Sequence, residues 1–399
     1  MGETQPSARQ PLAGIRVVEL STMVTCSLAS MIIRSQGAEV IKIEPIQVGD
    51  PMRLLGSQNN GISALFHNCN RGKRSLAIDI KHDLGREAVH RLARQSDVFL
   101  NNYRPGVMDK LGLGSQALRA LNPQLINVAV TGFGTVGPLA HRPAYDHVIQ
   151  GISGMTALQG GDSEFAFIRM LICDKVTAYT VAQAATAALV GRASTGQGQH
   201  IDISMLHACL AFMWPDGMMH HTLDDGVDLP PMSDYYQTVN GKDGSVASAP
   251  LLDQHWDAIL SLLNRDDLRE DSRFNTMAGR IAHMGEVMAI LRDGARHLST
   301  DAIMDAFEQA DIPSTICENR DTLRENEQIA AIGALETYVT ENMGRLTAPT
   351  PPVLFDGAPS SLAEPSPKLG AHSRDILQEL AFDAASIDRL ISEQAVLCA

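Results

Sequence analysis

Short, continuously apolar runs alternate with helical patterns from Ile15 onward, and this alternation constrains the fold more than any other feature of the sequence. Runs rich in β-branched residues are typical of buried strands. Strands that alternate with helices predict βα units and a parallel sheet covered on both faces. The apolar runs are "IRVVEL", "AEVIKIE", "RSLAIDI", "DVFLNN" and "LINVAV". We therefore expect an α/β fold built on a doubly wound parallel sheet.

The length of the chain, 399 residues, exceeds the size at which one hydrophobic core keeps growing, so two domains are expected. We assign residues 10–212 to a large α/β domain and the loop-like stretch 213–232 to a linker. Residues 233–325 carry a hairpin pattern around Asn240–Gly244 and several helical patterns, which predicts a smaller α+β domain. Residues 326–399 contain a Pro- and Ser-rich connection and a final helical pattern, and form a linker and a C-terminal segment.

Charge and cysteine content narrow the class of protein. The formal net charge of −14 argues against binding to nucleic acids or anionic membranes, because both need a basic face. The six cysteines show no C-x-x-C pair and no zinc-finger spacing, which favours a reduced chain without a metal site. No signal peptide pattern occurs, and no run approaches the roughly 20 apolar residues of a membrane span. We expect a cytoplasmic protein.

The residues that follow each apolar run are candidates for a binding site, since ligands of doubly wound sheets bind beyond the carboxyl ends of the strands. No G-x-G-x-x-G sequence opens the first helical pattern, so a nicotinamide or flavin fingerprint is absent, and no Walker sequence occurs. The positions to consider are Ser21–Thr25, Lys81, Asn102–Arg104 and Thr131–Gly134.

Asp174 stands between the apolar run "MLIC" and a long alanine-rich helical pattern. One interpretation is a plain N-cap, because aspartate accepts hydrogen bonds from the first helical turn. The other is a nucleophile, because a carboxylate in a partly dry site can attack an acyl carbon. Tyr145 and Asp146 offer polar support, although each also fits a packed aromatic and a second cap. Cys173 is a further candidate nucleophile, but cysteine in an apolar run usually behaves as a small hydrophobe.

Basic residues lie after or near the expected strand ends, at Lys81, Lys110 and Arg142. Any one of them is compatible with a solvated surface position. Together they favour a ligand with phosphate groups, because lysine and arginine are the side chains that bind phosphate.

Several longer motifs carry a resemblance to a known family. They include "GAEVIKIEPIQVGDPMR", "FHNCNRGKRSLAIDI", "DVFLNNYRPGVMDKLGL", "CDKVTAYTVAQAATAALVGRASTGQGQHIDISMLHA" and, nearer the end, "RFNTMAGRIAH" and "LGAHSRDIL". Through these motifs the chain resembles, nearly end to end, the family III CoA-transferases. That family includes formyl-CoA transferase, carnitine CoA-transferase and the bile-acid CoA-transferases, and 2-methylacyl-CoA racemase is related to it.

The resemblance implies a function and a site. An enzyme of this family moves CoA from an acyl-CoA donor to a carboxylic acid, and the residue at the position of Asp174 is its nucleophile. It forms a mixed anhydride and then an aspartyl-CoA thioester. CoA and acyl-CoA are substrates, and no tightly bound cofactor is implied. The residues that the resemblance places around CoA are Lys81, Asn102, Tyr103 and Lys110 at the adenosine diphosphate, Ile78 and Val107 along the pocket, and Val24 and Thr25 near the thioester. Arg142 is added as a CoA-binding candidate because of its charge and its place near a strand end.

The resemblance also implies an interlocked homodimer. In this family each chain passes through an opening in the other, and the active site lies between the large domain of one subunit and the small domain of its partner. The C-terminal segment would then return to the large domain.

The sequence departs from the family in three places, which keeps alternatives open. The loop after the first strand reads "VTCS" where members usually carry "AGP", often with glutamine ahead of it, so a polar group that could orient an acyl intermediate is missing. Pro45 replaces an arginine of formyl-CoA transferase, and no glycine-rich lid occurs between Trp214 and Tyr235. A racemase is one alternative, although racemases carry histidine at Tyr145 and a phenol is a poor base at neutral pH. A CoA-ester-binding paralogue without turnover is the other.

Overall fold

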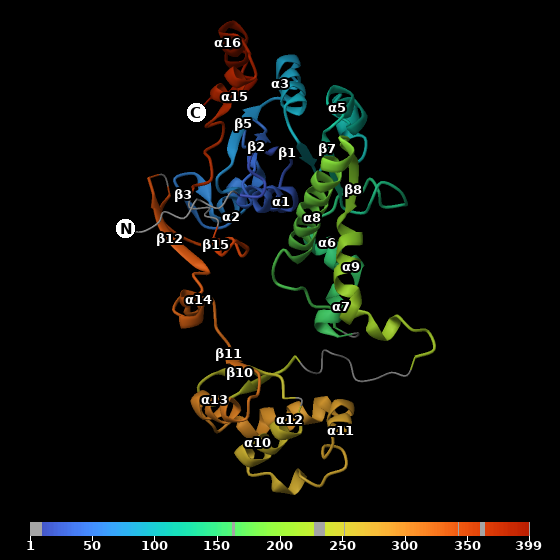
Figure 1. Ribbon diagram of the computed structural model, residues 1–399, viewed down its shortest axis with the longest axis vertical. Helices are drawn as coiled ribbons and strands as arrows, with labels where there is room; N and C mark the ends of the chain where they lie inside the picture. Colours follow the sequence, from blue (N-terminus) through green and yellow to red (C-terminus); the bar gives the residue numbers. More distant parts are fainter. Residues whose placement is uncertain are drawn as a thin grey trace. The chain divides into compact units, whose positions relative to one another are not determined.

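The computed structural model describes residues 10–161, 164–226, 236–250, 252–341, 343–359 and 364–398. Outside the described residues lie 1–9, part of the expected linker, 227–232, and the first residues of the expected small domain, 233–235. The chain divides into two compact units (Figure 1). The large unit comprises the residues up to Phe212 and those from Ala330 onward, and the small unit comprises Met213–Ile329.

A seven-stranded sheet forms the centre of the large unit, with the strand order β16-β5-β2-β1-β6-β7-β8. All neighbouring pairs are parallel except β16 with β5. The strands are β1 (Arg16–Leu20), β2 (Glu39–Glu44), β5 (Arg74–Ile78), β6 (Val98–Asn101), β7 (Ile126–Thr131), β8 (His200–Ser204) and β16 (Val396–Leu397). The α/β prediction is confirmed, and β8 and β16 are strands that the apolar runs did not indicate.

Helices cover both faces of this sheet. Val18 and Leu20 of β1 contribute to a buried core with α3 (Asp83–Arg94), α5 (Ser115–Leu121), α15 (Ser373–Glu379) and α16 (Ala384–Ser392). On the other face α1 (Val24–Ser35) and α8 (Ile172–Thr195) pack against each other and against the strands. Because side chains alternate along a strand, Glu19 and Lys42 point away from the first core and are fully buried.

The remaining elements of the large unit are short and mostly join the strands. They are η1 (Pro51–Leu54), β3 (Gln58–Asn59), β4 (Ile62–Ser63), α2 (Ala64–Asn70), α4 (Val107–Lys110), α6 (Asp146–Ser153), α7 (Met155–Gly160), β12 (Leu335–Thr340), β13 (Gly344–Pro349), β14 (Leu354–Phe355) and β15 (Ala358–Pro359). Elements near or across the boundary between the units are α9 (Met205–Gly217), η2 (Met219–His221), η5 (Thr322–Arg324) and α14 (Glu327–Ala331).

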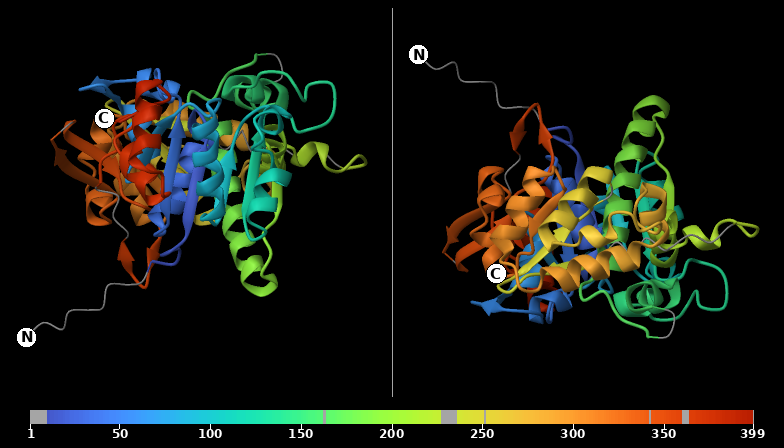
Figure 2. Two further views of the ribbon diagram at one scale, coloured as in Figure 1. Left: turned by 90° about the horizontal axis from the view of Figure 1, so that it is seen from above. Right: turned by 90° about the horizontal axis from the view of Figure 1, so that it is seen from below.

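The C-terminal segment returns to the large unit, as expected. Figure 2 shows it beside the first strands, and Val396 of β16 pairs with Ile78 of β5. The single helical pattern expected here is two helices, because Ala381 has a φ of 58° and ends the first of them. Asp383 then caps α16 by accepting a hydrogen bond from the N–H of Ser386.

The small unit combines an antiparallel sheet, in the order β11-β10-β9, with helices. The expected hairpin is present, with Ser245 of β10 opposite Asn240 of β9. One of the helical patterns expected in this domain, around residues 279–292, forms two helices that meet at His283. The elements are β9 (Thr238–Asn240), β10 (Ser245–Ser248), α10 (Asp253–Leu263), η4 (Asp266–Leu268), α11 (Met277–Ala282), α12 (Met284–Ala295), α13 (Thr300–Gln309) and β11 (Ser314–Ile316).

Candidate active site

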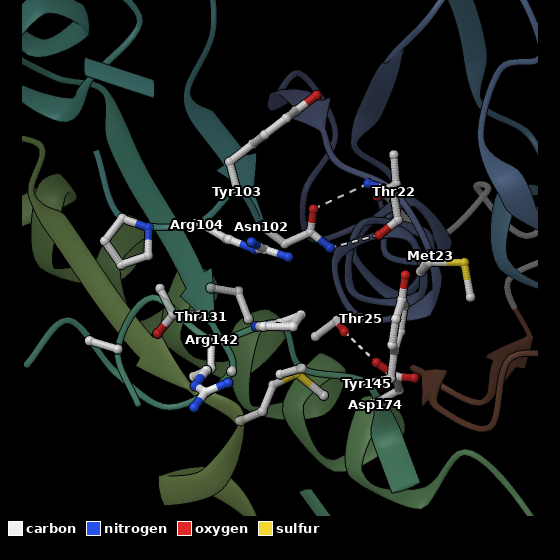
Figure 3. A pocket seen from close by; sticks show the side chains of 17 residues that line it. Thr22, Met23, Thr25, Asn102, Tyr103, Arg104, Thr131, Arg142, Tyr145 and Asp174 are labelled. Carbon is white, nitrogen blue, oxygen red and sulfur yellow. Dashed lines mark hydrogen bonds between the residues drawn. The ribbon is translucent and has the colours of Figure 1, made fainter. Parts of the chain in front are cut away.

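A pocket of about 230 Å³ opens beyond the carboxyl ends of β1, β6 and β7 (Figure 3). The chain builds the sheet outward from β1 to β2 and β5, and then from β6 to β7 and β8 on the other side. The pocket therefore lies at the point where the strand order reverses, which is where ligands bind in doubly wound sheets. Of the expected site residues, it is lined by Thr25, Asn102, Tyr103, Arg142, Tyr145 and Asp174.

Asp174 is the third residue of α8, which begins at Ile172 with Leu171 as its N-cap. The expectation that Asp174 caps the helix is therefore wrong, since the helix starts inside the apolar run "LIC". The residue is 8% exposed, and its Oδ1 accepts a hydrogen bond of 2.6 Å from Oγ1 of Thr25. The first turn of a helix still favours a negative charge, so the position suits an ionised carboxylate.

Asp146 holds the backbone of Asp174. It is the first residue of α6 and does not cap that helix, contrary to expectation. Instead, its Oδ2 accepts a hydrogen bond of 3.0 Å from the backbone N–H of Asp174, and its Oδ1 accepts one of 2.6 Å from Gln150. The preceding residue, Tyr145, is 59% exposed and lines the pocket.

Burial raises the pKa of Asp174 from 3.8 to about 6, while the hydrogen bond from Thr25 opposes the rise and the charge of Asp146 adds to it. The carboxylate is then ionised at neutral pH and poorly hydrated. Loss of hydration makes a carboxylate a better nucleophile, and a pKa near the working pH also suits general base catalysis.

Cys173 is a poor alternative nucleophile. Its side chain is fully buried, and Sγ lies 3.8 Å from the sulfur of Met155. Contact with Cys209 and burial raise the pKa of the thiol, so the reactive thiolate is disfavoured.

The residues "VTCS", expected in the loop after the first strand, instead form the first turn of α1. Thr25 donates its hydroxyl to Asp174, so this turn does bring a polar group to the carboxylate. Val24, by contrast, is buried in a cluster with Met52, Ile62 and Phe66. It lines neither this pocket nor the second pocket of the large unit, described below.

A second pocket of about 450 Å³ lies beside the first in the large unit. It contains the other expected binding residues, Ile78, Lys81, Val107 and Lys110, and Tyr103 lines both pockets. Pro45, which replaces an arginine of formyl-CoA transferase, lines this second pocket. The expected site thus falls into two adjacent compartments that share one aromatic side chain.

Arg104 is one of the strand-end candidates, although the family resemblance gives it no role in CoA binding. It lines the first pocket with Arg142, and the structure assigns neither guanidinium an ion pair within the described residues. The loop that carries Arg142 and Tyr145 lies close to β7, because a Cβ at Gly132 would lie 2.2 Å from the Cβ of Ala144. Glycine at this position lets the loop approach the strand.

Within the described part of the chain, no group of three or more His, Cys, Asp or Glu side chains could hold a metal ion. Across the same residues no helix is long and apolar enough to cross a membrane.

Comparisons with known proteins agree on one family. The model of CoA-transferase family III matches residues 12–373. The chain is 30% identical to the succinate–glutarate CoA-transferase of Agrobacterium fabrum over 388 residues, which cover 94% of this chain and 97% of that protein. It is 28% identical to the (R)-2-hydroxy-4-methylpentanoate CoA-transferase of Clostridioides difficile over 402 residues, with coverage of 96% and 99%.

Solved structures lead to the same family. A CaiB/BaiF family protein from Brucella suis superposes with a TM-score of 0.81 at 32% identity, covering 93% of this chain and 99% of that one. The resemblance stated from the motifs is confirmed: the chain is an enzyme of the CoA-transferase type and belongs to CoA-transferase family III.

Proposed function

We propose that the enzyme moves CoA from an acyl-CoA donor to a carboxylic acid, with Asp174 as the nucleophile. The observation that carries the proposal is the setting of this carboxylate. It is buried, it lies at the edge of a pocket at the reversal of the strand order, and both its side chain and its backbone are held by Thr25 and Asp146.

The exchange proceeds in four steps. The Asp174 carboxylate attacks the acyl carbon of the donor thioester and expels CoA as a thiolate, which leaves a mixed anhydride of Asp174 and the donor acid. The thiolate attacks the Asp174 carbonyl carbon, which releases the donor acid and leaves an aspartyl-CoA thioester. The acceptor carboxylate attacks this thioester and expels the thiolate. The thiolate then attacks the acceptor acyl carbon of the second anhydride, which gives the new acyl-CoA and free Asp174.

The two pockets suggest how CoA lies. The adenosine diphosphate part fits the pocket with Lys81 and Lys110, because ammonium groups favour phosphates. Tyr103 forms the passage to the first pocket, where the pantetheine would bring the thioester to Asp174. Arg104 and Arg142 are available there for a further anionic group of CoA or of the acid.

We also propose that the enzyme works as an interlocked homodimer. Large apolar side chains are exposed on and after α6, which favours burial by a second chain: Val148, Ile152, Phe165 and Phe167 are 40%, 45%, 75% and 53% exposed. A dimer would also bring a second wall to a pocket that in the family lies between subunits.

The test is a transfer assay with isotopically labelled acids, read by mass spectrometry. Donor acyl-CoA esters are incubated with a panel of carboxylic acids, including the dicarboxylates named for the relatives. Wild type and Cys173→Ala should form new acyl-CoA esters, whereas folded Asp174→Asn should form none. Exchange of the α-proton of a 2-methylacyl-CoA with deuterated solvent, without transfer, would instead favour the racemase. Binding of CoA without either reaction would favour the inactive paralogue.

A further inference from the structure

Met23 adopts a backbone conformation that is almost confined to glycine. Its φ is 63° and its ψ is −167°, and it directly precedes the first residue of α1. A residue with a side chain is strained in this region, and the conformation persists only where the surroundings enforce it. Thr25, the residue that donates to Asp174, follows only two positions later.

Asp50 holds the N–H of Met23. Oδ1 of Asp50 accepts hydrogen bonds of 3.1 Å from Met23 and 2.9 Å from the N–H of Met52, where it caps η1. The residue is fully buried, and its Oδ2 lies 2.9 Å from the ammonium of Lys42. One carboxylate therefore joins the strained peptide to a buried cation.

Lys42 is itself fixed on several sides. Its ammonium donates to Glu19 at 2.5 Å and to Ser27 at 3.0 Å, and Lys42 and Glu19 are fully buried. It also donates to the carbonyl oxygen of Ser21 at 3.3 Å, at the start of the same loop. Buried ion pairs of Lys42 with Glu19 and Asp50 thus fix the position of Asp50 from outside Thr22 and Met23.

Asn102 holds the neighbouring residue from the end of β6. Its Oδ1 accepts from the N–H of Thr22 at 3.1 Å, and its Nδ2 donates to the carbonyl oxygen of Thr22 at 2.6 Å (Figure 3). Together, Asn102 and Asp50 constrain two successive residues of the loop. The amide of Asn102, expected to bind CoA, therefore already has a bidentate partner in the protein.

We infer that Asp50 and Asn102 are positioning residues of the transfer reaction. They keep Thr22–Met23 in the strained conformation that directs the first turn of α1 toward α8, so that the hydroxyl of Thr25 reaches Asp174. This inference rests on the proposed role of Asp174. A hydrogen bond to a charged group is comparable in strength to the strain that it must offset. Without it, Met23 returns to a negative φ and Thr25 moves away from the carboxylate.

A purely structural role for Asp50 is the competing explanation, because it also balances the charge of Lys42. Met23→Gly separates the two roles. Glycine adopts the same φ and ψ without strain, so in Met23→Gly the loop keeps its conformation with less help from Asp50. The charge of Lys42 still needs Asp50 as its partner in this variant.

The experiment compares Asp50→Ala and Asp50→Asn in the wild-type and Met23→Gly backgrounds. Asparagine keeps an oxygen that accepts from Met23. We expect Asp50→Ala to lower kcat about 10- to 100-fold, the equivalent of one hydrogen bond to a charged group, with little change in the KM for acyl-CoA. The decrease in kcat should be smaller for Asp50→Asn than for Asp50→Ala. For Asp50→Ala it should be smaller in the Met23→Gly background than in the wild-type background. Equal losses in the two backgrounds would overturn the inference.

Asn102→Ala is the second variant, since it leaves the buried charges intact if Asp50→Ala does not fold. It should lower kcat more than it raises the KM, and the opposite pattern would mean that Asn102 serves CoA binding. Asn101→Ala is the matched control, because the side-chain amide of Asn101 donates to the carbonyl oxygen of Val128 in β7.

Crystal structures of the same variants give a readout that does not depend on activity. Residue 23 should leave the positive φ region in Asp50→Ala or Asn102→Ala and stay there in Asn101→Ala. Retention of a φ near 63° in both loop variants would overturn the inference, whatever the activity. Transfer activity without any effect of Asp174→Asn would refute the proposed nucleophile and leave this structural result standing.

Discussion

Oγ1 of Thr25 lies 2.6 Å from Oδ1 of Asp174, although the two residues are 149 positions apart in the chain. The contact joins the first turn of α1 to the first turn of α8, the two helices that pack together on one face of the sheet. Because both helix starts lie at the carboxyl ends of parallel strands, the fold itself brings the hydroxyl to the carboxylate.

Thr25→Val should move the acid limb of the pH profile of kcat/KM to higher pH. The Thr25 hydroxyl stabilises ionised Asp174 and so lowers its pKa, and its removal raises the pKa of the group that must be ionised to attack. Thr25→Ser keeps the hydroxyl and should keep the profile. Identical acid limbs in the valine and serine variants would show that the hydrogen bond does not act on the nucleophile.

Asp174→Asn should be more stable than wild type at neutral pH. Burial raises the folded-state pKa of Asp174 from 3.8 to about 6, so between these values the folded protein binds more protons than the unfolded one. Wild type therefore loses stability as pH rises through this window, by up to about 3 kcal/mol, and the variant does not. Calorimetry from pH 5 to pH 8 should show a stability gap that widens up to about pH 6 and then stays constant. A gap that narrows with rising pH would contradict the raised pKa.

Lys81→Ala and Lys110→Ala should raise the KM for acyl-CoA with a smaller effect on kcat. Both lysines line the pocket assigned to the adenosine diphosphate part, and a contact between an exposed ammonium and a phosphate is screened by salt. The difference from wild type should therefore shrink at high ionic strength. Lys368→Ala removes a lysine that lines neither pocket and serves as the control. An unchanged CoA affinity in the Lys81→Ala/Lys110→Ala double variant would remove this pocket from the CoA site.

The interlocked homodimer predicts slow exchange of subunits. Separation of two interlocked chains requires substantial unfolding, so the dimer should persist on dilution to nanomolar concentration. Mass photometry of dilute protein, and mixing of isotopically light and heavy dimers under native conditions, test this directly. An active monomer at micromolar concentration would contradict both the dimer and a site shared between subunits.

Much of the large unit follows from its strand sequences, and the failures have physical causes. Runs such as "IRVVEL" are apolar throughout because both faces of a parallel strand are buried. No apolar run indicates β8, "HIDIS", because three of its five positions carry polar or charged side chains. None indicates β16 either, because that strand has only two residues. The sequence does not indicate that α8 begins at Ile172, because an apolar run before an aspartate resembles a strand followed by an N-cap.

The site was predictable in position but not in detail. Strand-end positions indicated Thr25, Asn102 and Arg104, because the edge of the sheet is fixed by topology. The contact between Asp146 and the backbone of Asp174, by contrast, joins two helices whose spacing no local pattern encodes. The role of Asp50 could not be predicted either. Its partner Lys42 looks in the sequence like a solvent-exposed lysine within an apolar strand, but it is fully buried beside Glu19.

The most direct test of the central claim is to trap the intermediate on Asp174. Wild type is incubated with an acyl-CoA donor in the absence of an acceptor acid, quenched in acid and mapped by mass spectrometry, with and without hydroxylamine. We predict a CoA adduct, converted to a hydroxamate by hydroxylamine, on the peptide that contains Asp174. It should be present in wild type and in Cys173→Ala, and absent in Asp174→Asn. An adduct on another residue, or full transfer activity in folded Asp174→Asn, would contradict the account.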